Sequence, residues 1–361
     1  MKVLKFGGTS VGSIENLRRV KEIVSHINGD VVVIVSAFGG VTDQILNMAK
    51  TASTTKTFNT DEMTAIATRH TTAIEALVPE HLQAETKQKI QQRLLDLENM
   101  IRGVSMIGEL SARTLDRIGG MGEMLSSTII AAFMEARWVN SMELIRTDSN
   151  FLKAVVDFDI TNKNISNEFE KFSGIAIAPG FVASNSEGIP TTLGRGGSDY
   201  TAAIYAAALD AEALEIWTDV TGFMTADPRV IRKAYTIDYL TYAEAMELSH
   251  FGAKVIYPPT ILPVYRKHIP VWIKNTTQPH EAGTLIGHEK RYAKDQRPIK
   301  GISSISNISM LTLQGAGMVG VTGISMRMFT ALAHEKVNVI LISQASSENS
   351  ISIAITSSEN E

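Results

Sequence analysis

Short runs of β-branched residues alternate with helical patterns along most of the 361-residue chain, and this alternation restricts the fold more than any other feature. Residues 3–6 and 31–37 are apolar runs of strand length. Between them, residues 14–27 carry apolar side chains at helical spacing behind Ser13, a residue type that caps helices. Strands that alternate with helices usually pair in parallel. The sequence therefore predicts an α/β fold with a mainly parallel sheet sandwiched by helices.

The same alternation continues through the middle of the chain, with one long interruption. Residues 50–117 are polar and have helical patterning, which favours a helical excursion that forms a lid or a dimerising bundle. Thr241 and Glu244 have the spacing of a capping box, which predicts a helix start. We expect further strands at residues 175–183 and 213–219, and helices at residues 122–136 and 198–208.

A charged segment near residue 290 separates two domains of unequal size, in agreement with the chain length. We predict a larger domain at residues 1–290, a linker at 291–300 and a smaller α+β domain at 301–361. In the smaller domain we expect a strand, a helix and two more strands, at residues 308–313, 324–332, 337–342 and 351–355. One helix covers only one face of such a sheet, so we expect the natural polypeptide to continue past Glu361.

The composition excludes several classes of function. A formal net charge of -4 offers no general attraction for nucleic acid, and the lack of cysteine excludes disulfides, thiolate metal sites and cysteine nucleophiles. The apolar run before Gly7 is too short for a secretory signal, and no run approaches the roughly 18 apolar residues that span a membrane. We expect a cytoplasmic protein without nucleic-acid or membrane partners.

The first chemical signal is K-F-G-G-T-S-V at residues 5–11, between the first predicted strand and helix. Gly7 and Gly8 let backbone N–H groups approach an anion, the helix start adds its positive dipole end, and Lys5 can hold a phosphate oxygen. Two glycines alone are also typical of an ordinary strand-to-helix turn. No G-x-x-x-x-G-K-[ST] motif occurs, which excludes a P-loop. A nucleotide would be held in another way.

Two further motifs carry polar chemistry. In T-L-G-R-G-G-S-D-Y-T at residues 192–201, Arg195 can grip a carboxylate, and Asp199 can hold an ammonium group or position a metal-bound phosphate. The same residues also suit a solvated turn that only caps a helix. W-T-D-V-T-G at residues 217–222, followed by A-D-P-R at 226–229, lies at the end of a predicted strand, where parallel sheets bind ligands. An Asp-Pro-Arg turn is also common on surfaces.

Taken together and in order, these segments resemble the aspartokinases of the amino acid kinase family, from Met1 to the end of the chain. G-E at residues 122–123 and F-G-A-K at 251–254 add to the match, although each alone only suits a helix dipole. The whole chain is most similar to the aspartokinase part of bifunctional aspartokinase/homoserine dehydrogenases. Its last segment, from Ile308, resembles an ACT domain that lacks the final helix and strand.

The resemblance implies an activity. An aspartokinase converts ATP and L-aspartate to ADP and 4-phospho-L-aspartate, the first step towards lysine, threonine and methionine, and it uses Mg²⁺ with the nucleotide. The resemblance also implies feedback regulation by an amino-acid effector, threonine or lysine, and a homo-oligomer. It assigns no metal-ligating side chains.

The resemblance also implies roles for matching residues. Lys5 would stabilise the charge that moves between the β- and γ-phosphates, and Asp199 would orient the substrate and the glycine loop. The N–H groups of Gly7 and Gly8 would meet the transferred phosphoryl group. Aspartate would be held by Ser36, Thr42, Glu123, Arg195 and Ser198, with Glu123 on its ammonium group and Arg195 on a carboxylate. The nucleotide would also be held by Thr218, Asp219, Arg229 and Lys254. The family often has a tyrosine where this chain has Met224, so the resemblance does not extend to adenine contacts there.

The chemistry agrees with this set of residues, because a carboxylate nucleophile is already ionised at neutral pH and needs no strong base. It needs charge cancellation and in-line positioning. Other readings stay open. Residues 315–320, G-A-G-M-V-G, match a dinucleotide-binding fingerprint, but too few residues follow for such a domain and no acidic residue ends its second strand. The chain could also be a non-catalytic amino-acid sensor, or a related kinase for glutamate, acetylglutamate or UMP.

Overall fold

The computed structural model describes the chain except for residues 253–254, 289–298, 345–348 and 358–361. The chain forms two compact units, Met1–Ser303 and Ser304–Glu361. Most of the linker predicted at 291–300 lies outside the described residues. Within the described part, no helix is both long enough and apolar enough to cross a lipid bilayer.

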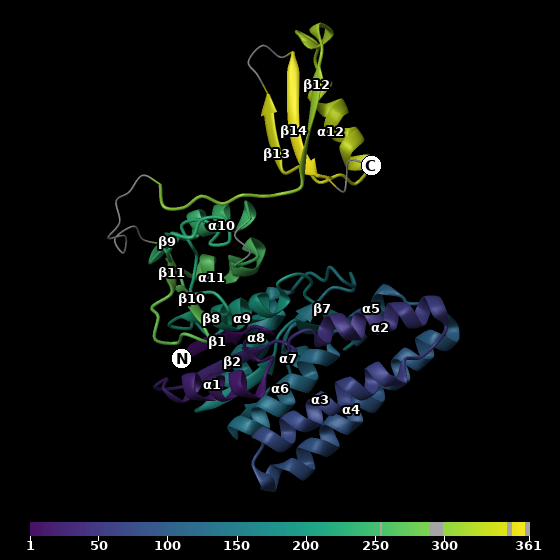
Figure 1. Cartoon of the computed structure of the whole chain (residues 1–361), viewed down its shortest axis with the longest axis vertical. Helices are drawn as coiled ribbons and strands as arrows, with labels where there is room; N and C mark the ends of the chain where they lie inside the picture. The colour runs from purple at the N-terminus through teal and green to yellow at the C-terminus, as the bar shows by residue number, and fades with distance from the viewer. Residues whose placement is uncertain (253–254, 289–298, 345–348, 358–361) are drawn as a thin grey trace. The chain divides into compact units, whose positions relative to one another are not determined.

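The larger unit is built on an eight-stranded sheet (Figure 1). Its strands are β1 (Lys2–Phe6), β2 (Val31–Val35), β3 (Arg137–Trp138), β5 (Ile175–Pro179), β8 (Leu214–Thr218), β9 (Tyr239–Thr241), β10 (Val271–Asn275) and β11 (Thr284–Gly287). They are ordered β3-β5-β2-β1-β8-β10-β11-β9, and the neighbours from β3 to β10 all pair in parallel. Among these described strands, the pair of β10 and β11 is the antiparallel one, and β11 pairs in parallel with β9. The predicted mainly parallel sheet is confirmed.

Helices cover both faces of this sheet. One apolar cluster joins one face to α1 (Ile14–Ser25), α2 (Val41–Thr55), α3 (Thr60–Leu77), α4 (Glu80–Ile107), α5 (Ala112–Gly119) and α6 (Met121–Met134). A second cluster joins the other face to α7 (Ser141–Leu144), α8 (Phe158–Phe169), α9 (Gly197–Ala208), α10 (Tyr242–His250), the short helix η1 (Pro258–Ile261) and α11 (Leu262–Lys267). Successive strand side chains alternate between the clusters, with Leu4 and Phe6 in the first and Val3 in the second. Burial on both faces explains why β2 and β5 are apolar throughout.

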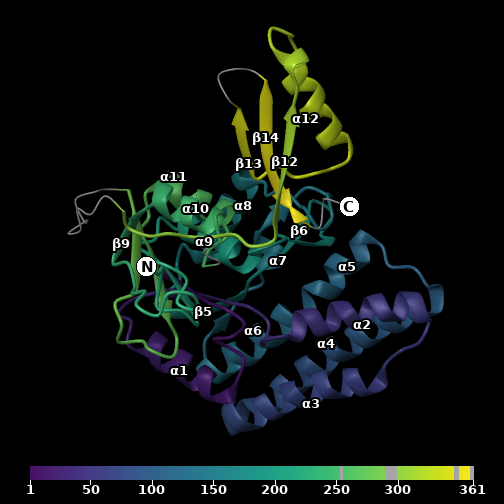
Figure 2. The same ribbon diagram turned by 45° about the horizontal axis from the view of Figure 1, so that its top comes forward.

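Local sequence signals set several helix boundaries as expected. The Ser13 hydroxyl accepts the N–H of Asn16 at 3.2 Å and caps α1, and Thr241 forms the predicted capping box with Glu244 at the start of α10. The predicted helical excursion is confirmed in α2 to α5. Within it, α3 and α4 lie side by side as a hairpin (Figure 2) and pack in the same apolar cluster as the sheet.

The strand predicted at residues 175–183 is wrong as a single element. β5 ends at Pro179, and β6 (Val182–Asn185) belongs to a separate sheet with β4 (Arg146–Thr147) and β7 (Pro190–Thr192). The chain turns at Gly180, and Phe181 has a φ of 69° in the left-handed region. A side chain on Gly180 would clash with Ser198 at the start of α9, so a contact distant in sequence requires glycine at this turn.

The smaller unit has the strand-helix-strand-strand order that the sequence predicts. It comprises β12 (Ile308–Gln314), the short helix η3 (Ala316–Met318), α12 (Ile324–His334), β13 (Leu341–Gln344) and β14 (Ser350–Thr356). The three strands form an antiparallel sheet in the order β12-β14-β13, whose buried core includes Ile351, Ile353 and Ile355. The strand expected at residues 337–342 begins only at Leu341, because Val337 and Val339 pack against this core from non-strand backbone.

Candidate active site

The parallel strands of the larger sheet end at one edge, and most of the sequence-predicted site residues gather there. From β1 the chain continues to β2 on one side, and it later enters β8 on the other side of β1. Such a reversal of strand order opens a crevice beyond the carboxyl ends of the strands, where α/β sheets bind ligands. The loops that follow β1, β2 and β8 therefore border one candidate site.

Lys5 and Asp199 form an ion pair at the centre of this edge. Lys5 is near the end of β1 and Asp199 is in the first turn of α9, and Nζ of the lysine lies 2.7 Å from Oδ1 of the aspartate. Their side chains are only 11% and 14% exposed. The same ammonium group lies over Gly7, where an added Cβ would be 3.4 Å from Nζ. A positive charge is thus held in place beside the first glycine loop.

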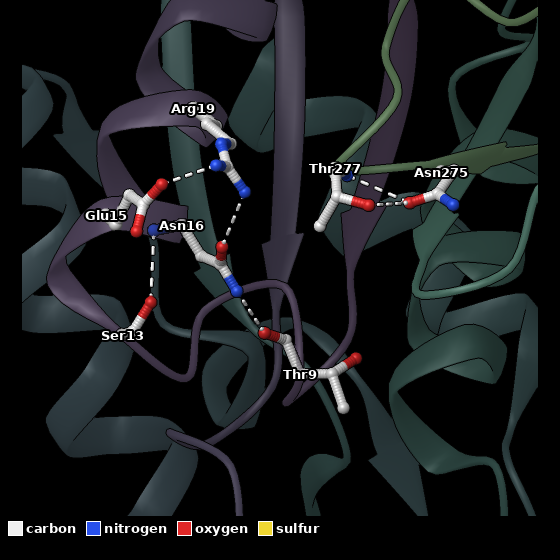
Figure 3. A network of polar contacts seen from close by, with 7 residues as sticks. All are labelled: Thr9, Ser13, Glu15, Asn16, Arg19, Asn275 and Thr277. Carbon is white, nitrogen blue, oxygen red and sulfur yellow. Dashed lines mark hydrogen bonds and ion pairs between the residues drawn. The ribbon is translucent and has the colours of Figure 1, made fainter.

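The first glycine loop contributes a donor at Gly8 and space at Gly7. The Gly7 N–H donates to Trp217 O at 3.1 Å, which extends the pairing of β1 with β8 and corrects the donor role expected for Gly7. For the Gly8 N–H, the described residues offer no acceptor. The loop is fixed from α1, because Asn16 Nδ2 donates to Thr9 O at 2.9 Å and Arg19 in turn contacts Asn16 (Figure 3).

The loop after β2 packs directly on the first glycine loop and on α6. A Cβ added to Gly39 would lie 3.0 Å from Gly8 O, and one added to Gly122 would lie 2.7 Å from the Ala37 Cβ and 3.3 Å from Thr42 Oγ1. These approaches require glycine at both positions. They bring Thr42 and the first turn of α6 to the same wall of the site.

Glu123, in that first turn, is a buried carboxyl group without a full set of partners. It is 5% exposed, and its Oε2 has no hydrogen-bond partner among the residues described. Burial raises its pKa from 4.5 to about 8, although the backbone N–H groups of Ala37 and Glu123 and the charge of Lys5 oppose this shift. A cation that enters with a ligand would stabilise the ionised form of such a buried carboxyl group. Ser36 is next to Ala37, and its carbonyl accepts the Ser126 hydroxyl at 2.8 Å.

The second glycine loop places Ser198 and Asp199 but leaves Arg195 exposed. Gly194 and Gly196 have φ values of 68° and 70°, which a glycine adopts without strain. The Arg195 guanidinium lies 5.6 Å from the centre of the Tyr257 ring, and no carboxylate of the described residues forms an ion pair with it. It is therefore available to an anionic ligand.

A buried aspartate that sequence reasoning missed supports this loop. Asp116, in α5, accepts the hydroxyl of Thr192 and, at 2.9 Å, the N–H of Leu152. Both donors adjoin the loop, since Thr192 begins it and a Cβ on Gly194 would lie 3.4 Å from Leu152 O. Nothing in the sequence around Asp116 marks this role, because its partners are 36 and 76 residues away.

The residues predicted to hold the nucleotide are only partly brought together. The Thr218 hydroxyl donates to Asp219 Oδ1 at 3.1 Å at the end of β8, and Asn275 Nδ2 reaches Asp219 O at 3.5 Å from β10. Arg229 is exposed and forms an ion pair at 2.8 Å with Asp227 within its own turn.

Two further positions belong to the sequence-based expectations for the nucleotide. Lys254 lies outside the described residues. Met224, where the family often has tyrosine, contacts the hydroxyl of Thr236 through its sulfur at 3.6 Å. The hydroxyls of Ser10, after β1, and Thr276, after β10, are 2.6 Å apart, a link that the motifs did not indicate.

Comparison with known proteins gives two family matches. The sequence profile of the amino acid kinase family matches residues 1–275, and that of the ACT domain matches residues 311–361. The chain is 35% identical over 370 residues to bifunctional aspartokinase/homoserine dehydrogenase 2, chloroplastic, of Arabidopsis thaliana, which covers 99% of the chain and 40% of that protein. It is 32% identical over 364 residues to lysine-sensitive aspartokinase 3 of Escherichia coli (strain K12), which covers 98% of the chain and 77% of that protein.

One similar solved structure is that of E. coli aspartokinase III in complex with aspartate and ADP (R-state). It has a TM-score of 0.83 and 30% sequence identity, over 99% of this chain and 78% of that one. The chain thus spans less than half the length of the bifunctional Arabidopsis relative and most of the length of the lysine-sensitive E. coli one.

Proposed function

The chain belongs to the amino acid kinase family, and from this premise we propose that it is an aspartate kinase. It would transfer the γ-phosphoryl group of ATP to the side-chain carboxylate of L-aspartate and release ADP and 4-phospho-L-aspartate. We assign this activity to residues 1–290. The similarity to aspartokinases along nearly the whole chain supports the assignment.

The observation that carries the proposal is the buried carboxyl of Glu123, whose Oε2 has no hydrogen-bond partner among the described residues, beside the Lys5–Asp199 pair. L-aspartate brings one ammonium group and two carboxylates. Glu123 would take the ammonium group, and Arg195 would take one carboxylate with its planar fork. Thr42, Ser36 and Ser198 would complete the contacts. UMP and acetylglutamate carry no free ammonium group, so neither would pair with Glu123. Glutamate carries one and differs from aspartate only in the length of its side chain.

The reaction requires little proton chemistry. The aspartate side chain is ionised at neutral pH and attacks the γ-phosphorus, while the bond from that phosphorus to the β-phosphate oxygen breaks and ADP leaves. Lys5 would stabilise the charge that moves onto the leaving oxygen, and the Gly8 N–H would donate to the transferred group. Asp199 holds Lys5 in this position through the ion pair.

Thr218, Asp219, Arg229 and Lys254 are proposed to bind the nucleotide. Mg²⁺ usually binds proteins through one or two carboxylates together with the phosphates of the nucleotide. Within the described part of the chain, no three acidic or histidine side chains form a metal-binding group, and Asp199 and Asp219 are carboxylates among the proposed site residues. These residues fit a magnesium ion that arrives with ATP and neutralises phosphate charge.

The second unit supports a proposal of regulation. Its match to the ACT domain and the name of the lysine-sensitive E. coli relative favour an amino-acid effector, with lysine or threonine as candidates. We assign this role to residues 301–361, and we propose a homo-oligomer in the cytoplasm that acts in the synthesis of lysine, threonine and methionine.

An acceptor panel tests the proposed activity. ADP release would be measured with Mg-ATP and, separately, L-aspartate, L-glutamate, N-acetylglutamate and UMP, with an acceptor-free reaction as control. We expect release to depend on aspartate. Turnover with a different acceptor and none with aspartate would overturn the assignment, and no turnover with any acceptor would favour a non-catalytic amino-acid sensor.

A further inference from the structure

Arg69, in the middle of α3, connects the two glycine-containing loops of the candidate site. Its Nη1 donates to Gly39 O at 2.8 Å, and its Nη2 donates to Gly12 O at 2.9 Å. Gly12 follows β1 and Gly39 follows β2. One planar guanidinium thus binds a carbonyl from each loop, a bridge that Lys cannot reproduce with the same geometry.

These two loops approach each other closely. A Cβ on Gly39 would lie 3.0 Å from Gly8 O and 3.8 Å from the Gly12 Cα, so the two loops meet without intervening side chains. Converging carbonyl oxygens are unfavourable beside a site for phosphate, unless a donor binds them. Because a peptide group is planar, the Gly40 N–H points away from the Gly39 carbonyl that Arg69 binds. The guanidinium therefore fixes the orientation of this peptide as well as the spacing of the loops.

The surroundings of Arg69 hold it in this position. Its guanidinium lies 5.8 Å from the centre of the Phe38 ring, in the loop after β2. His70 stacks on the same ring with centroids 5.0 Å apart. Burial lowers the pKa of His70 to about 4, so the imidazole is neutral at physiological pH and adds no charge that would repel Arg69.

We propose that Arg69 is a positioning residue for phosphoryl transfer, which binds the loops after β1 and β2 together so that their N–H groups meet the transferred phosphoryl group in a fixed geometry. This inference rests on the proposed function. It gives the α3–α4 hairpin a role in the site, although Arg69 contacts backbone carbonyl oxygens of the loops and would not contact the substrate.

The kinetic test compares Arg69→Lys and Arg69→Met with Arg93→Met. Arg93 is a matched control, because it is also a partly buried helical arginine over an aromatic ring, 5.3 Å from Trp138, and lies outside the site. We expect kcat of both Arg69 variants to fall by about tenfold or more, while KM for ATP and aspartate changes by less than about threefold, since positioning acts mainly on the transition state. The Arg93 variant should retain its kcat.

Chemical rescue adds a readout that a purely structural loss would not give. A hollow of about 260 Å³ borders Arg69 and is lined by Gly12, Phe38 and Thr72 among others. Guanidinium ion added at low millimolar concentration, well below denaturing levels, should enter the space left in Arg69→Ala and restore part of kcat. Ammonium ion at the same concentration should restore less.

Hydrogen exchange separates this inference from the proposed function, because it requires no turnover. In both Arg69→Lys and Arg69→Met, amide exchange should accelerate by about tenfold in peptides from residues 7–13 and 38–42, and it should stay unchanged in α8. The positioning role would be overturned if amide exchange in these loops were unchanged, or if it accelerated equally across the whole larger unit. Faster exchange in a protein that does not phosphorylate aspartate would refute the proposed function alone.

Discussion

The raised pKa of Glu123 predicts that aspartate binding depends on pH in the physiological range. In the free protein, burial keeps this carboxyl largely protonated at pH 7, while the substrate ammonium group requires the ionised form. Binding must therefore release a proton below pH 8. The KM for aspartate should fall as the pH rises towards the pKa, whereas the KM for ATP should not follow the same curve.

The size of the effect follows from the titration curve. With a pKa of about 8, Glu123 is ionised in about one tenth of the molecules at pH 7 and in about three quarters at pH 8.5. If only the ionised form binds, the KM for aspartate falls about eightfold between these values. Lys5 is the neighbouring charge that favours ionisation, and its influence is already included in the pKa.

Glu123→Gln removes the titration and keeps the size of the side chain. We expect the variant to lose the pH dependence, with a KM for aspartate roughly tenfold or more above the native value at pH 8.5, about 1.4 kcal/mol. At pH 7 the two proteins should differ less, because most native molecules are then uncharged at this position. If the ratio of the two KM values changes between pH 7 and pH 8.5, the variant has lost a charge; a loss of shape would give the same ratio at both pH values.

The assay is coupled ADP release at saturating ATP, with aspartate titrated at intervals from pH 6.5 to 8.5. Glu215→Gln is the matched control, because Glu215 is equally buried but already lies 3.6 Å from Lys2 and 3.8 Å from Lys274. It should keep the native pH dependence. A flat native profile, or a Glu123→Gln profile with the native slope, would refute the assignment of Glu123 to the ammonium group.

Three further predictions concern the other elements of the site. Lys5→Ala should lower kcat by roughly a hundredfold or more, about 3 kcal/mol of transition-state stabilisation, and a near-normal kcat would exclude its role. Arg195→Lys should raise the KM for aspartate by roughly tenfold while the KM for ATP changes much less, because an ammonium group lacks the planar fork; equal effects on both substrates would contradict the assignment. Asp116→Ala leaves the buried Thr192 hydroxyl and the Leu152 N–H without this acceptor, and it should lower the free energy of unfolding in urea by about 2 kcal/mol. A variant as stable as the native protein would show that water replaces the carboxylate.

The sequence predicts those parts of the fold that depend on local patterns. Apolar strands, the Ser13 cap and the Thr241 capping box act within a few residues, and the structure confirms them. The prediction for residues 175–183 failed because it followed the apolar run across Pro179 and Gly180, a dipeptide that is typical of turns. The approach of Ser198, which leaves no room for a side chain at Gly180, is visible only in the packed structure.

The candidate site likewise has features that the sequence shows and features that only the structure shows. Glycine loops are visible in the sequence because closely approaching backbone excludes side chains, and glycine is the residue that permits this approach. The side chains that hold those loops in place are hidden in the sequence, because most of their partners are backbone groups, which every residue has. Arg69 binds carbonyl oxygens 30 and 57 residues away, and Asp116 accepts from a backbone N–H and a threonine hydroxyl. Their neighbours in sequence show only ordinary helical patterning. A loop that presents its N–H groups to an anion must direct its carbonyl oxygens elsewhere. In this fold Arg69, on α3, donates hydrogen bonds to two of those carbonyl oxygens. The motif therefore locates the site, while its geometry depends on residues that no motif includes.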